Sequence, residues 1–167
     1  MEKLASIQID QYPASVADFL ALRARLGGSP AGAATALIVA LTCFVQEPQV
    51  GQACLEATIH PNRLADGQLP RVTYQFMWEQ LSQAPYIVRS YVYGTRPENG
   101  YQLPPPPYQF HFFRNRLSEE QGDDTYKLFV HCTGADTARP VTMRQTENGQ
   151  WLALEWSTLI VGVREPA

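Results

Sequence analysis

The stretch "ALIVALTCFV", Ala36 to Val45, is the most apolar part of the chain and decides the fold. It lies within a segment without charged residues that runs from Gly27 to Gln46. Ser29 followed by Pro30 is typical of a helix start, because proline already has the φ that the first helical position requires. The sequence therefore predicts a helix over 30–45 that is apolar nearly all round and lies at the centre of the molecule.

This central helix is too short to span a membrane. A helix over 30–45 would be about 24 Å long, whereas the hydrocarbon core of a bilayer is about 30 Å thick. The N-terminal residues "MEKLASIQIDQYP" contain no apolar core of a signal peptide. The three cysteines all lie within apolar runs, which indicates reduced thiols. We therefore expect a cytoplasmic protein without a membrane-spanning segment.

Further helices are predicted on both sides of the central one. A helix begins after Ser15, a good N-cap, and ends at Gly27-Gly28. Two more helices are expected over 48–59 and 71–81, and the segment 84–94 reads as either a strand or a continued helix. Three apolar side chains of the 71–81 helix are available for packing: Val72, Phe76 and Trp78.

The second half of the chain has the alternation of antiparallel strands. Strands are expected over 108–115, 126–133, 139–146 and 151–156, with 159–163 as a possible fifth. A segment over 97–107 precedes them and contains four consecutive prolines, which favour an extended polyproline II strap. The fold class is therefore α+β in a single domain, 1–167, with about four helices over 13–94 packed on an antiparallel sheet of four to five strands over 108–164.

The alternation also separates two faces of this sheet. Phe110, Phe112, Leu128, Val130 and Val141 share the face that should meet the helices. The opposite face, here called the outer sheet face, mixes aromatic and charged side chains: His111, Phe113, Phe129, His131, Thr142 and Arg144, with Glu155 as a further candidate. Two histidines are fewer ligands than a zinc site needs. We interpret this face as a surface for a protein partner or for self-association.

Composition and motifs exclude several function classes. The net charge is −3, and the 13 lysines and arginines are scattered, so a nucleic-acid surface is not expected. No phosphate-binding glycine loop, nucleophile elbow or zinc-protease motif is present, so no catalytic residue, metal or cofactor is assigned.

The loops carry the remaining polar candidates. Asp136 and Arg139 lie in the connection "TGADTARPVTMRQ", where they can orient a ligand or clamp the turn. The clamp interpretation is favoured, and it predicts that Asp136→Ala costs roughly 1–3 kcal/mol of stability. The full set of candidate binding residues is Arg89, Tyr91, Asn99, Tyr101, Asp136, Arg139 and Arg144.

Several motifs in the C-terminal half resemble those of a bacterial family known only as a domain of unknown function. The motifs are SY-x-x-G-x-x-P-x-N-x-Y over 90–101, a Pro-Tyr strand entry at 107–108, GAD-x-x-RP over 134–140, Gln-Trp at 150–151 and Arg-x-Pro at 164–166. Thr137-Ala138 departs from the Ser-Pro expected within the third motif. The resemblance implies no activity, and it implies a bacterial, intracellular, single-domain protein.

Two functional hypotheses follow from these residues. The first is a non-enzymatic binding module that meets a protein partner, or its own copy, through the outer sheet face and the loops at 99–101 and 136–139. The second is a small-molecule-binding or hydrolytic domain with a pocket between helices and sheet, lined by Asp136, Arg139, Arg89 and Tyr91. Convergence of Arg89 with Asp136 and Arg139 on a pocket would favour the second hypothesis.

Overall fold

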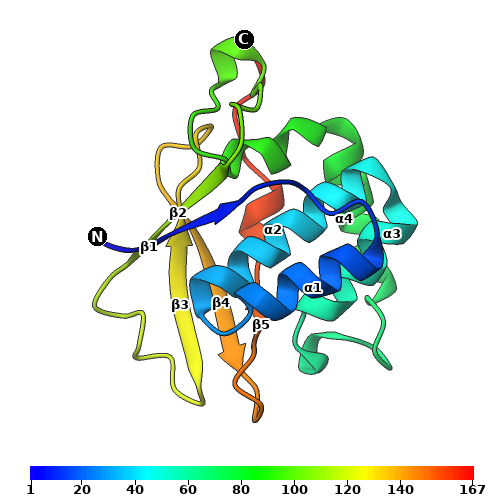
Figure 1. The fold of residues 1–167 in the computed structure, drawn as a ribbon, viewed down its shortest axis with the longest axis vertical. Coiled ribbons are helices and arrows are strands. Elements are labelled where there is room, and N and C mark those ends of the chain that lie inside the picture. Colours follow the sequence, from blue (N-terminus) through cyan, green and yellow to red (C-terminus); the bar gives the residue numbers. More distant parts are fainter.

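A five-stranded antiparallel sheet carries the helices on one of its faces (Figure 1). The computed structural model describes all 167 residues. The strands lie in the sheet in their chain order, β1-β2-β3-β4-β5, and the fold is α+β as predicted. Their bounds are β1 Glu2–Ile9, β2 Tyr108–Arg114, β3 Thr125–Val130, β4 Arg139–Gln145 and β5 Trp151–Glu155. The helices are α1 Val16–Leu26, α2 Pro30–Gln46, α3 Pro48–Thr58 and α4 Arg71–Gln83.

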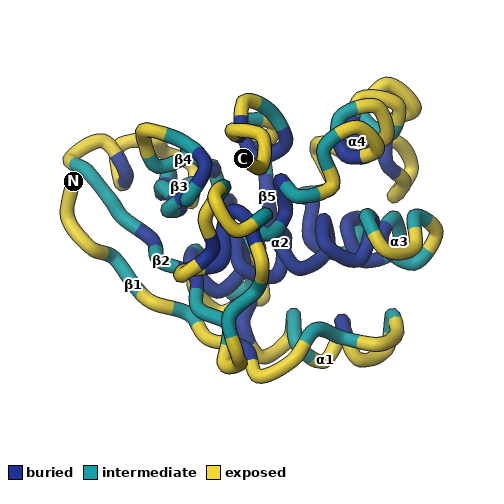
Figure 2. The backbone as a smooth tube through the Cα atoms, turned by 90° about the horizontal axis from the view of Figure 1, so that it is seen from above, coloured by how far each residue is buried: buried dark blue, intermediate teal, exposed yellow.

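Helix α2 is the central helix that the apolar stretch predicts. Its N-cap Ser29 accepts a hydrogen bond from the backbone N–H of Gly32, and nearly every residue from Ala31 to Phe44 is buried. Figure 2 shows it as a buried tube between the sheet and the other helices. None of the helices combines the length and the apolar character that a bilayer crossing requires. All three cysteines are buried and unpaired.

Helix α4 differs from its prediction in the side chains that it buries. Val72, Phe76 and Trp78 were expected to pack, but they are 83%, 37% and 44% exposed. The buried residues are Met77 and Leu81, which lie four apart on the opposite side of the helix from Val72. The helix therefore presents apolar side chains both to the core and to solvent.

The fifth strand is at the N-terminus of the chain, not at its C-terminus. Residues 2–9 pair with β2, with Ile7 opposite Phe110 and Ile9 opposite Tyr108. The segment expected as a possible strand, 159–163, begins instead within a 3₁₀ turn, η4 Ser157–Ile160. Residues 2–9, and not 159–163, form the fifth strand because Ala5, Ile7 and Ile9 place apolar side chains on the inner face of the sheet.

Two connections also take conformations that the sequence did not specify. Residues Pro85–Tyr91 form a 3₁₀ helix, η2, which is neither a strand nor a continuation of α4. A short 3₁₀ turn, η3 Pro97–Asn99, follows. Residues 105–107 form a bend, so the proline run is not extended throughout as the expected polyproline II strap would be. The Pro106–Pro107 peptide bond is cis.

The faces of the sheet are as predicted. Phe110, Phe112, Leu128, Val130 and Val141 are all buried against the helices. The register pairs Phe112 with Val130 and Leu128 with Val141, so the apolar side chains form continuous rows beneath α2.

Candidate functional site

Arg139 ties the C-terminal segment to the start of β4. Its Nη1 donates to the backbone oxygens of Thr158 (3.0 Å) and Val161 (2.9 Å), and its Nη2 donates to that of Gly162 (2.6 Å). Thr158 returns a hydrogen bond from its hydroxyl to the backbone oxygen of Pro140. The guanidinium therefore acts as a three-point anchor for residues 158–162.

Asp136 does not pair with Arg139. Its carboxylate accepts a hydrogen bond from Arg164 at 2.8 Å, and its side chain is 93% exposed. It accepts no hydrogen bond from the backbone of its own turn. An ion pair this exposed adds little to stability, so the turn is anchored by Arg139 and not by Asp136.

Tyr101 joins three segments of the chain. Arg89 donates from Nε to the backbone oxygen of Tyr101 (3.0 Å) and from Nη2 to that of Gly100 (3.3 Å). The Tyr101 hydroxyl donates to the backbone oxygen of Arg164, and its ring stacks on that of Tyr86 at 5.4 Å. These contacts hold Tyr101 in a left-handed backbone conformation (φ 56°), which is uncommon for a tyrosine.

The rest of the predicted set is divided between the same segments and the sheet. The buried Tyr91 donates from its hydroxyl to the backbone oxygen of Leu159 at 2.6 Å. Asn99 accepts a hydrogen bond from the backbone N–H of Gln102, which closes the turn that contains it. Arg144 lies on β4 and makes neither a side-chain hydrogen bond nor an ion pair. Four of the seven predicted residues, Arg89, Tyr91, Tyr101 and Arg139, thus bond to backbone carbonyls.

These residues do not converge on one pocket. An open depression of about 490 Å³ lies over the 134–140 turn, with Asp136, Arg139 and Arg164 in its lining, but Arg89 is not part of it. Gly134 sits at its base, where a Cβ would come within 2.2 Å of the Tyr101 hydroxyl oxygen. Three of the sequence motifs therefore come together around the C-terminal segment, where hydrogen bonds to backbone carbonyls join them. These are the motifs at 90–101, 134–140 and 164–166.

The outer sheet face brings its two histidines together. The backbone N–H of His131 donates to the backbone oxygen of His111 on the neighbouring strand, and Tyr93 stacks on the His111 ring with centroids 4.4 Å apart. Phe113 pairs with Phe129 across the same two strands, and the Lys127 ammonium lies 5.8 Å from the Phe129 ring. No group of three or more potential ligands that could hold a metal ion is present.

Both of these histidines make the stability of the protein depend on pH. Burial lowers the pKa of His131, and burial followed by the charges of Lys3 and His131 lowers the pKa of His111, from the ordinary value of 6.5. The fold thus holds both rings neutral, while the unfolded chain takes up protons as the pH falls through about 6.5. We expect their contribution to stability to be complete above that pH and to be lost as the pH falls through the folded-state pKa values.

Urea unfolding at about pH 7.5 and about pH 5.5 measures this effect. The double variant His111→Gln, His131→Gln should lose less stability between the two pH values than the wild type loses. An equal loss in both proteins would assign the dependence to other groups, such as His60, whose pKa is also lowered by burial.

A partly enclosed apolar pocket lies beside α4, at a place that the sequence analysis did not predict. Its volume is about 280 Å³. The α4 pocket is lined by Ile59, Leu69, Val72, Phe76, Trp156 and Ile160. Ile59, Leu69, Trp156 and Ile160 are buried core residues that form its base, whereas Val72 and Phe76 form an exposed wall. In this pocket, exposed and buried apolar side chains are therefore continuous.

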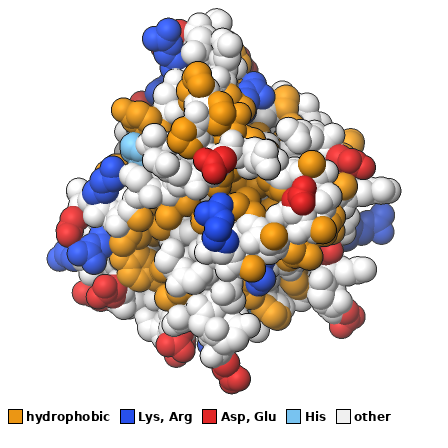
Figure 3. Space-filling view, in the orientation of Figure 1, with side chains coloured by type: hydrophobic (Ala, Val, Ile, Leu, Met, Phe, Trp, Pro, Cys, Tyr) orange, Lys and Arg blue, Asp and Glu red, His pale blue; other side chains and the backbone are white.

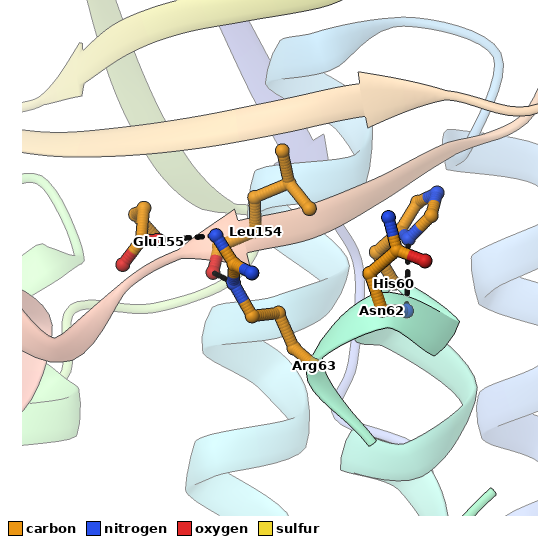
Figure 4. Close-up of polar contacts among 5 residues, drawn as sticks. All are labelled: His60, Asn62, Arg63, Leu154 and Glu155. Atoms are coloured by element: carbon orange, nitrogen blue, oxygen red, sulfur yellow. Dashed lines mark hydrogen bonds and ion pairs between the residues drawn. The ribbon is translucent and has the colours of Figure 1, made fainter.

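An ion pair borders the α4 pocket on the β5 side (Figure 4). Arg63 is the last residue of a 3₁₀ turn, η1 Pro61–Arg63. It donates from Nη2 to a Glu155 carboxylate oxygen at 2.8 Å and from Nε to the backbone oxygen of Leu154 at 3.3 Å. His60 holds that turn, because its Nδ1 accepts a hydrogen bond from the backbone N–H of Asn62. The pocket therefore combines an apolar interior with one positive and one negative group at its rim.

The sequence contains a signal for this pocket. Val72 and Phe76 are four residues apart on one side of α4, while Met77 and Leu81 are four apart on another. A single helix with two apolar stripes needs two partners. The core supplies one, so the second stripe indicates a surface that is free to bind.

Comparison with known protein families matches residues 11–167 to a family model described as "Domain of unknown function (DUF6935)". No curated protein and no solved structure matches the sequence.

Proposed function

The chain belongs to the DUF6935 family, and from its geometry we propose that it is a non-enzymatic binding module whose main contact surface is the α4 pocket. The ligand is a protein partner that inserts a large apolar side chain between α4 and the end of β5. The exposure of Val72 beside a buried apolar base carries this proposal. A monomer surface keeps such a patch mostly where something binds.

The dimensions and chemistry of the pocket support a side chain as the bound group. A volume of about 280 Å³ is at the small end of the range for ligand pockets. Exposed aromatic and aliphatic anchors that fill such pockets supply most of the binding energy of many interfaces. Arg63 and Glu155 at the rim are half-exposed and offer hydrogen bonds to the backbone on either side of an inserted side chain.

The charge distribution also supports a protein partner. On the face in Figure 3, basic and acidic side chains are interspersed, and exposed hydrophobic atoms lie between them. A mixed surface of this kind is suited to a protein partner as any ordinary protein surface is, whereas a nucleic-acid surface concentrates basic residues.

The outer sheet face is the second candidate surface. Tyr93 is 53% exposed while its ring stacks on His111, so a rigid aromatic group is presented to solvent. Aromatic groups of this kind are enriched in interfaces. Arg144 lies on the same face, whereas we assign Arg89, Tyr91, Tyr101 and Arg139 to holding the loops. A hydrolytic function has less support, because no nucleophile and general base lie together in the depression at Asp136.

Selection from a random peptide library displayed on phage tests the proposal. Peptides enriched on the wild-type protein should contain a large apolar side chain. Val72→Asp should weaken their binding by at least about tenfold, since it places a charge against an apolar contact. Because Val72 is 83% exposed, this change should leave the fold intact.

Two matched variants locate the binding. Leu20 on α1 is 43% exposed, so Leu20→Asp is an apolar-to-acid change away from the pocket and should leave the affinity unchanged. Binding that is lost in Tyr93→Asp and kept in Val72→Asp would move the function to the outer sheet face. Failure to enrich any peptide, or equal binding to Val72→Asp, contradicts the α4 pocket as the contact surface.

A further inference from the structure

One edge strand of the sheet, β5, is hydrogen-bonded to other parts of the chain, whereas the other edge strand, β1, is free. The open side of β5 is occupied by other parts of the chain: Trp151 donates its backbone N–H to Gly27, Ala153 accepts from the backbone N–H of His60, and Leu154 accepts from Arg63. Strand β1 is the other edge, and its backbone has no hydrogen-bond partner beyond β2. Figure 2 shows β1 along the rim of the molecule with no element outside it.

The register identifies which backbone groups of β1 are free. The backbone oxygens of Gln109 and His111 accept from Tyr93 and His131, on the side of β2 away from β1. Ser6 and Gln8 are the β1 residues opposite His111 and Gln109. In an antiparallel pair, such residues direct their own N–H and C=O groups away from the partner strand. The free edge therefore offers the backbone groups of Ser6 and Gln8.

We propose that β1 pairs antiparallel with β1 of a second copy of this chain, so that two sheets join into one across a two-fold axis at Ile7. Ser6 of one copy then exchanges both backbone hydrogen bonds with Gln8 of the other, and the reverse pair repeats this by symmetry. The surface is distinct from the α4 pocket, so the inference goes beyond the proposed function.

The sequence of β1 is complementary to itself in this register. Ile7 meets Ile7 on the inner face of the joined sheet, and Ala5 lies opposite Ile9, which is already buried in the single chain. Leu4, Ala5 and Ile7 are only partly buried in the single chain, so the second copy covers apolar surface that is now open. On the outer face, the polar side chains of Ser6 and Gln8 lie opposite each other.

Sedimentation velocity over about 1 to 200 µM protein tests the proposal on the chain with no tag at its N-terminus. The sedimentation coefficient should rise with concentration to that of a dimer. Gln8→Pro removes an outward N–H and keeps the bonds between β1 and β2, because proline is tolerated where an edge N–H faces solvent. It should weaken the dimer by at least about tenfold, whereas Gln8→Thr, which keeps the N–H, should not.

Hydrogen exchange distinguishes loss of the dimer from a folding defect. The exchange of the Ser6 and Gln8 amides of the wild type should slow as the protein concentration rises, because these N–H groups become hydrogen-bonded only in the dimer.

Three results would overturn the proposal. These are a monomer throughout the concentration range, a dimer whose dissociation constant is unchanged in Gln8→Pro, or exchange of the Ser6 and Gln8 amides that does not depend on concentration. A dimer that is kept in Gln8→Pro but lost in Tyr93→Asp would place the contact on the outer sheet face instead.

Discussion

Replacing Arg139 by alanine should lower the free energy of unfolding by about 2–4 kcal/mol. The guanidinium supplies three hydrogen bonds to the backbone oxygens of Thr158, Val161 and Gly162, and the change removes them together. Hydrogen bonds from a charged donor are worth more than neutral ones, and the carbonyls of the partly buried Thr158 and Val161 lose their partners. Urea unfolding followed by tryptophan fluorescence measures the loss.

Two variants distinguish the hydrogen bonds of Arg139 from effects of charge in the turn. Asp136→Ala should change stability by no more than about 0.5 kcal/mol, because its ion pair with Arg164 is exposed. This replaces the loss of roughly 1–3 kcal/mol that the clamp interpretation of Asp136 predicts from the sequence. Arg139→Lys keeps the charge but not the planar fork, so it should recover less than half of the loss. Equal effects of Asp136→Ala and Arg139→Ala would contradict the assignment.

The fold class is predictable from the sequence where one pattern dominates. The charge-free run that becomes α2 is apolar on all sides, so only the centre of the molecule can hold it. The alternation of Phe110 and Phe112, and of Leu128 and Val130, fixes the buried face of the sheet, because a shift by one residue would turn every one of these side chains outward.

Strand β1 and the α4 pocket were missed for a different reason. The alternation of Ala5, Ile7 and Ile9 is a strand signal, but it is short and stands beside a helical half, and its partner lies about a hundred residues away. In α4, the stripe of Val72 and Phe76 reads like any packed stripe. Which of two apolar stripes is buried depends on the neighbours that tertiary structure supplies, and a local pattern does not contain that information.

The polar candidates show the same limit. The sequence places Asp136 and Arg139 three residues apart in one turn, which favours a clamp within that turn. The structure gives each of them a partner from the C-terminal segment instead, Arg164 for the acid and the 158–162 carbonyls for the guanidinium. Their partners depend on where the segment after β5 lies in the folded chain. The spacing of residues within the turn contains no information on that position.

Replacing Gly51 by alanine should lower the free energy of unfolding by about 2–3 kcal/mol. Gly51 lies on α3 where that helix crosses α2, and a Cβ there would come within 2.1 Å of the Phe44 Cα and 2.2 Å of its backbone nitrogen. Those atoms belong to the backbone of the central helix and have no rotamer to move to. Alanine favours a helix by about 1 kcal/mol over glycine, but separating α2 from α3 costs more than this gain.

Gly28 provides the matched control. It lies in the connection between α1 and α2, its φ is not in the left-handed region, and a Cβ there would meet nothing within 4 Å. Gly28→Ala should therefore be neutral or stabilise by up to about 1 kcal/mol through the unfolded chain. Thermal unfolding of the two variants beside the wild type gives the comparison. Gly51→Ala with the melting temperature of Gly28→Ala would mean that α2 and α3 can move apart freely, and that the closely packed centre inferred from the apolar stretch is not what holds the helices in place.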